Sequence, residues 1–137
     1  MRRLLFITAI ALLALPAAQG QAAKAKNVEL LHGTVRAVGH GAQGKAAVVL
    51  TGRKRVLTLR NFHIDPGPQV RVYLVPRGVK GNGDVRKDFK DLGKLKGSKG
   101  NQQYTIPGSV DLRRYRSVIF WCVPFTQTLA RADLSRS

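Results

Sequence analysis

Residues 117–123 read Ser-Val-Ile-Phe-Trp-Cys-Val, which is the most informative run in the chain. Its apolar side chains occupy both alternating positions, so a strand built from it would expose neither face to water. Such a run is typical of a central strand that is covered on both sides. Pro124 follows and brings no backbone N–H, so the strand is predicted to end at Val123. The sequence therefore predicts a sheet with this run inside it.

Shorter runs on either side read as further strands, separated by glycine-rich or proline-containing turns. They are predicted at residues 31–38, 46–50, 56–62, 70–75, 102–106 and 129–134. Residues 76–98 form a charged, glycine-rich insertion around Phe89, Leu92 and Leu95. No helical apolar stripe longer than two turns is visible. We therefore expect an all-β fold, an antiparallel β-sandwich of about 7–9 short strands.

The N-terminus has the pattern of an export signal. Arg2 and Arg3 precede an apolar run from Leu4 to Leu15, and Pro16 and small residues follow it. The run is too short to span about 30 Å of hydrocarbon as a helix, and no later stretch reaches that length. We expect a cleavable signal peptide over residues 1–22, a flexible leader over 23–29 and one domain over 30–135. The mature protein is thus expected to be secreted or extracytoplasmic, with no transmembrane segment.

The chain of 137 residues carries a formal net charge of +17 and one cysteine. A single cysteine excludes an intramolecular disulfide and an all-cysteine zinc site. The basic residues are spread along the chain, which favours a solvated surface or attraction to an anionic polymer of the cell envelope. Nucleic acid is disfavoured as a partner, because no basic helix or aromatic stacking motif accompanies the charge.

Catalytic constellations are absent from the sequence. It holds no GxSxG, P-loop or HExxH motif and no carboxylate pair that suggests a hydrolase or transferase, and no metal site is predicted. Cys122 is the one reactive candidate, and two interpretations stay open for it. It is either a small buried hydrophobe or a redox thiol at the end of its strand. His63 would share the inward parity of Leu57 and Leu59 if its strand ran unbroken past Phe62, and it is otherwise a structural histidine.

Several fragments, taken in order, resemble the DM13 domain family. They are His32–Val35, Leu57–Phe62, Gly67–Pro68 with Val70–Leu74, Leu92–Lys96 with Gly100–Pro107, and Val110–Leu112 with Tyr115–Cys122 and Phe125. The resemblance spans about residues 31–134. It implies a small exported β-sandwich with an electron-transfer role, in which Cys122 matches the signature cysteine of the family.

Two functions follow from these observations. The resemblance implies an accessory redox module that acts through Cys122, either as a bare thiol or as the ligand of a haem-type group, with a redox protein as its partner. Trp121, Phe125 and His63 are then the candidate cofactor-binding residues. The alternative is a basic module that binds anionic envelope material and merely packs Cys122 in its core. The chain departs from the family pattern at Gln69, where an acidic residue is usual, and over residues 129–134.

Overall fold

The computed structural model describes residues 11, 13–16 and 26–137. Apart from residues 11 and 13–16, the predicted signal peptide lies outside the described residues, as do residues 23–25 of the predicted leader. None of the helices described is long and apolar enough to cross a membrane. The first strand begins at Asn27, so residues 27–29 of the predicted leader belong to the folded domain.

Nine strands and one short helix make up the described part of the chain. In order, they are β1 (Asn27–Ala37), β2 (Ala42–Thr51), β3 (Lys54–Ile64), β4 (Val70–Pro76), α1 (Asn82–Lys87), β5 (Lys90–Lys94), β6 (Gln102–Ile106), β7 (Tyr115–Cys122), β8 (Gln127–Asp133) and β9 (Ser135–Arg136).

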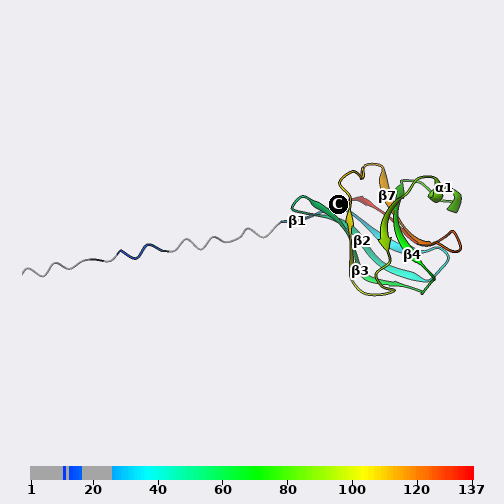
Figure 1. Ribbon diagram of the computed structural model, residues 1–137, viewed down its shortest axis with the longest axis horizontal. Helices are drawn as coiled ribbons and strands as arrows, with labels where there is room; N and C mark the ends of the chain where they lie inside the picture. The colour runs from blue at the N-terminus through cyan, green and yellow to red at the C-terminus, as the bar shows by residue number, and fades with distance from the viewer. Residues whose placement is uncertain (1–10, 12, 17–25) are drawn as a thin grey trace, which may run out of the picture.

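The strands form one sheet in the order β5-β4-β7-β8-β1-β2-β3-β6, with β9 paired to β1. The sheet is strongly curved (Figure 1). The sheet folds into two layers, one of β1, β2, β3 and β6 and the other of β8, β7, β4 and β5. β1 joins them, because most of it pairs antiparallel with β2 and residues 35–37 pair antiparallel with β8. The segment after β5 returns to β3 through a bridge between Lys99 and His63, so the sheet nearly closes around its core. The predicted antiparallel β architecture is confirmed.

Gly33 lets β1 pass from one layer to the other. A Cβ at this position would collide with the carbonyl oxygen of Asp133 at the end of β8. The absence of a side chain therefore permits the close approach of the two backbones.

β7 lies between β4 and β8, and both of its faces are covered, as its sequence predicts. Val118, Phe120 and Cys122 face the main core between the two layers. Ile119 and Trp121 face outward, where Val85 of α1 helps to cover them. The neighbouring residues Trp121 and Cys122 therefore occupy two different hydrophobic clusters.

β3 contains a bulge that reverses its alternation. Lys45 pairs with Arg60 and Gln43 pairs with His63, so two residues of β3, Asn61 and Phe62, lie opposite Gly44 alone. Asn61 has a φ of 49° and Gly44 a φ of 136°. After this extra residue Phe62 and Ile64 are buried and His63 is turned away from the core, contrary to the alternation of an unbroken strand.

The predicted insertion of residues 76–98 contains two elements that the sequence analysis missed. The six-residue helix α1 buries only Val85. β5 pairs with β4 and extends one edge of the sheet. A helix this short shows no apolar stripe, and a strand with one glycine and two lysines lacks the usual alternation, so neither leaves a clear pattern.

Candidate redox site

Cys122 is the last residue of β7 and lies in the main core. Only 1% of its surface is exposed. Its backbone pairs with Val70 of β4 on one side and with Gln127 of β8 on the other. The Sγ–H group donates a hydrogen bond to the carbonyl oxygen of Pro68, 3.4 Å away. The sulfur is therefore shielded from solvent, and its hydrogen is directed at a backbone acceptor.

The loop between β3 and β4, residues 65–69, brings this acceptor to the sulfur. Gln69 adopts a φ of 46°, in the left-handed region, and its carbonyl oxygen accepts a hydrogen bond of 3.2 Å from the backbone N–H of Val123. Gly67 lies against Leu129, where an added Cβ would be 3.0 Å from the Leu129 side chain. The loop is thus held against the β7–β8 turn and against β8, and it places the carbonyl oxygen of Pro68 next to the sulfur of Cys122.

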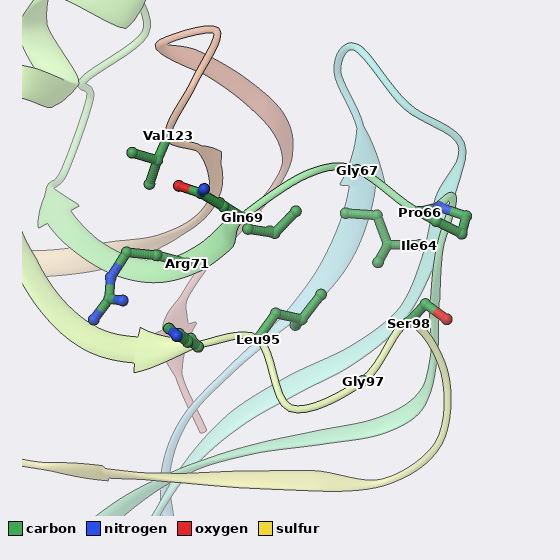
Figure 2. Close-up of a pocket in the computed structure, with 11 residues that line it drawn as sticks. Ile64, Pro66, Gly67, Gln69, Arg71, Leu95, Gly97, Ser98 and Val123 are labelled. Atoms are coloured by element: carbon green, nitrogen blue, oxygen red, sulfur yellow. The ribbon is translucent and has the colours of Figure 1, made fainter.

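A surface pocket of about 600 Å³ lies on the outer side of this loop, and we call it the loop-end pocket. Its lining comes from residues 64–71, from the segment after β5 and from Val123, as Figure 2 shows. Gln69 and Val123 lie side by side on one wall, and Leu95 occupies the floor (Figure 2). Cys122 does not line the pocket, but its sequence neighbour Val123 and its pairing partner Val70 do. One residue therefore separates the sulfur from the pocket.

A family model described as "Electron transfer DM13" matches residues 34–134. The chain belongs to the DM13 family. No curated protein and no solved structure matches the chain. Membership of this family indicates an electron-transfer-related role. The match covers every strand from β2 to β8.

The DM13 domain does not bring Cys122 and His63 together. His63 is partly exposed on the outer side of β3, whereas Cys122 faces the core. Within the described part of the chain, no group of three or more His, Cys, Asp or Glu residues could hold a metal ion. The two candidate ligands therefore do not share a site.

A haem ligated through Cys122 does not fit this arrangement. The sulfur is enclosed by core side chains, and its hydrogen points at Pro68 and away from open space. The loop-end pocket has the size of a small-molecule site, but no sulfur or imidazole reaches it among the described residues. The residues around Cys122 therefore do not form a haem site.

Trp121 lies on the opposite face of the sheet from the sulfur. It stacks on Tyr73 with a centroid distance of 6.0 Å, and Tyr73 stacks on the partly exposed Phe89 at 4.3 Å. Burial, and then the negative charge of Asp91, raise the pKa of Tyr73 above its ordinary value. The sequence analysis singled out Trp121 but missed Tyr73, although the alternation of residues 70–75 places Tyr73 opposite the core-facing valines.

Phe125 is 64% exposed in the turn between β7 and β8. It does not line the loop-end pocket, whereas Val123 in the same turn does. Val38, in the turn between β1 and β2, is also exposed, and its backbone N–H donates to the carbonyl oxygen of Leu129. These apolar side chains rise from neighbouring turns at the end of the DM13 domain that holds Cys122.

The structure shows where the two departures from the family pattern, Gln69 and residues 129–134, lie. Gln69 lines the loop-end pocket, so the usual acidic residue would bring a negative charge there. Of residues 129–134, Leu129, Ala130, Ala132 and Leu134 lie in the main core, and Arg131 lies on the outer face. The altered C-terminal pattern therefore builds part of the core and leaves the surroundings of the sulfur apolar.

Proposed function

We propose that this chain is an exported electron-transfer domain in which Cys122 is the group that gains and loses the electron. The observation that carries the proposal is the position of the sulfur. Its Sγ is buried in the core, yet it contacts the loop that forms a wall of the loop-end pocket. A redox partner seated on that end of the domain would be separated from the sulfur by a single layer of residues.

Burial of the sulfur favours electron transfer over nucleophilic chemistry. A cysteine attacks a disulfide or an electrophile by direct contact with its sulfur, and the buried Sγ of Cys122 is closed to such a reagent. An electron can cross a layer of packed protein without any contact between the reacting atoms. Burial also keeps the sulfurs of two chains apart, so an oxidised sulfur does not couple into a disulfide.

The proposed oxidation of Cys122 is a coupled transfer of one electron and one proton. The Cys122 thiol gives one electron to an oxidised high-potential metal centre of a partner protein, which is reduced. The Sγ–H proton, directed at the carbonyl oxygen of Pro68, is released to bulk water, and a thiyl radical remains. An electron from a reduced metal centre and a proton from water restore the thiol.

The end of the domain that holds Cys122 supports docking of such a partner. Val38, Val123 and Phe125 expose apolar surface there, and fully buried apolar contacts are what stabilise protein interfaces. Lys94 and Arg71 line the adjacent pocket, although Arg71 is paired with Asp91 at 2.8 Å. A partner with an apolar patch and a few carboxylates around its metal centre would complement this surface.

Oxidation by hexachloroiridate(IV), which accepts a single electron without bonding to the sulfur, tests the proposal. The native protein, Cys122→Ser and Val118→Thr are titrated, and consumption of the oxidant is followed by absorbance. Val118→Thr is the matched control, because Val118 is a fully buried neighbour on the same face of β7 and the change also adds a hydroxyl to the core.

We expect the native protein and Val118→Thr to consume one more equivalent than Cys122→Ser, since the chain has one cysteine. Trp121 and Tyr73 remain in all three proteins, so any oxidation of aromatic side chains cancels in the comparison. Equal consumption by the native protein and Cys122→Ser would refute a redox role for the sulfur.

A further inference from the structure

A second pocket, which we call the basic cup, lies on the outer face of the sheet and has a volume of about 390 Å³. Five cationic side chains and one carboxylate line it: Arg36, Arg77, Lys80, Arg116, Arg131 and Asp133. They come from β1, β7, β8 and the segment between β4 and α1. Five cations around one carboxylate leave a large positive excess in a confined space.

The inner part of the basic cup is held rigidly. Arg131 donates from Nη1 to the carbonyl oxygen of Val79 at 2.8 Å and from Nη2 to Asp133 Oδ1 at 2.7 Å. Arg116 donates from Nε to the carbonyl oxygen of Leu112 at 2.9 Å. Both guanidinium groups are thus positioned before any ligand arrives, which reduces the entropy lost on binding.

The outer part of the basic cup offers free positive charge. Among the described residues, the side chains of Arg77 and Lys80 have neither a hydrogen-bond nor an ion-pair partner, and both residues are exposed. Two cations held close together repel each other, and an anion between them removes that repulsion. Guanidinium groups also match the oxygens of phosphate or carboxylate in pairs.

Asp133 adds an acceptor to this cationic surface. Its Oδ1 accepts from Ser117 and Arg131, whereas within the described part of the chain its Oδ2 accepts from Arg36 alone, at 2.7 Å. Partial burial would raise the pKa of Asp133, but the hydrogen bonds of Arg131 and Ser117 and the charges of Arg131 and Arg36 outweigh it and hold the pKa low. An ionised carboxylate oxygen with a free lone pair therefore faces the cup.

We infer that the basic cup binds a phosphoryl group that carries a P–OH, as inorganic phosphate does at neutral pH and as a phosphate monoester does in its monoanionic form. The cations neutralise its charged oxygens, and Oδ2 of Asp133 accepts the hydrogen of the P–OH. Sulfate has the same shape but carries no hydrogen at neutral pH, so Asp133 repels it. This inference is independent of the electron-transfer role, because the cup lies on the outer face of the sheet and Cys122 lies in its core.

Calorimetric titration with inorganic phosphate, at neutral pH and low ionic strength, tests the inference. The variant Arg77→Gln with Lys80→Gln removes two cations of the cup. The matched control, Arg60→Gln with Lys99→Gln, removes two exposed cations from a separate groove along β3 and β6 and lowers the net charge equally. We expect saturable binding that the cup variant weakens by roughly tenfold or more and that the control variant changes by less than about twofold.

Three results would overturn the inference. The first is the absence of saturable phosphate binding. The second is an equal loss in both double variants, which would reduce the effect to net charge. The third is sulfate binding as tight as phosphate binding, which would remove the role assigned to Asp133. Tighter binding of phosphate than of sulfate supports it.

Co-sedimentation with phosphatidylcholine vesicles, with and without phosphatidic acid, distinguishes a lipid headgroup from a soluble phosphate as the ligand. Binding that requires phosphatidic acid, is lost in the cup variant and is reversed by inorganic phosphate identifies a lipid headgroup. Phosphate binding without vesicle binding identifies a soluble phosphate. Both results support a phosphoryl site in the cup.

Discussion

The Sγ of Cys122 and the carbonyl oxygen of Pro68 lie 3.4 Å apart, although 54 residues separate them in the chain. This contact joins the end of β7 to the loop between β3 and β4. It places the thiol beneath the loop that forms a wall of the loop-end pocket. The sulfur is close to the surface without being accessible from it.

The thiol of Cys122 is expected to resist modification in the folded protein. Titration with a thiol-reactive dye should detect no fast-reacting group in the native state and one group after unfolding in denaturant, since the chain has one cysteine. The native rate should be limited by the small fraction of molecules in which the β3–β4 loop is open. Stoichiometric labelling of the native protein within seconds would contradict the burial of the sulfur.

Gly44→Ala should destabilise the domain through the β3 bulge. The φ of Gly44 is 136°, and an added Cβ would lie 2.9 Å from the Cα of Phe62. We expect a loss of about 1–3 kcal/mol in the free energy of unfolding, measured by chemical denaturation.

Gly83→Ala is the control for that experiment. Gly83 lies in α1, and an added Cβ there meets no atom within 4 Å. This change should leave the domain as stable as before or stabilise it by about 0.5–1 kcal/mol. A similar loss in both variants would show that the bulge imposes no special requirement at residue 44.

Stability should fall in acid, in part through Asp133. The folded protein holds the pKa of Asp133 below its ordinary value of 3.8, against the effect of burial, by hydrogen bonds from Arg131 and Ser117. A lowered folded pKa contributes stability at pH values above the ordinary pKa, and this contribution is lost as the pH falls through the folded value. Asp133→Asn should therefore show a shallower loss of unfolding free energy below about pH 4. Parallel pH profiles for the two proteins would refute this.

The sequence predicted β7 and the antiparallel β architecture well, because a short run that is apolar on both faces is typical of a central strand covered on both sides. It could not predict the orientation of His63. A single extra residue at Asn61 reverses the alternation of β3, and nothing local in the sequence marks it except Gly44 on the neighbouring strand.

The surroundings of Cys122 were only partly predictable. Pro124 does end the strand near the sulfur, but the acceptor at Pro68 and the covering loop come from a distant part of the chain. The basic cup depends still more on tertiary structure, because it joins residues from Arg36 to Asp133 that share no sequence pattern. Because the basic residues are spread along the sequence, they predict only a solvated surface. The fold brings five of them together in one pocket.

The most direct test of the account is freeze-quench electron paramagnetic resonance of the native protein, mixed for milliseconds with one equivalent of hexachloroiridate(IV). We predict a sulfur-centred radical that is absent from Cys122→Ser and present in Val118→Thr. A spectrum that contains only tyrosyl or tryptophanyl radicals, and that Cys122→Ser leaves unchanged, would contradict the claim that Cys122 carries the electron.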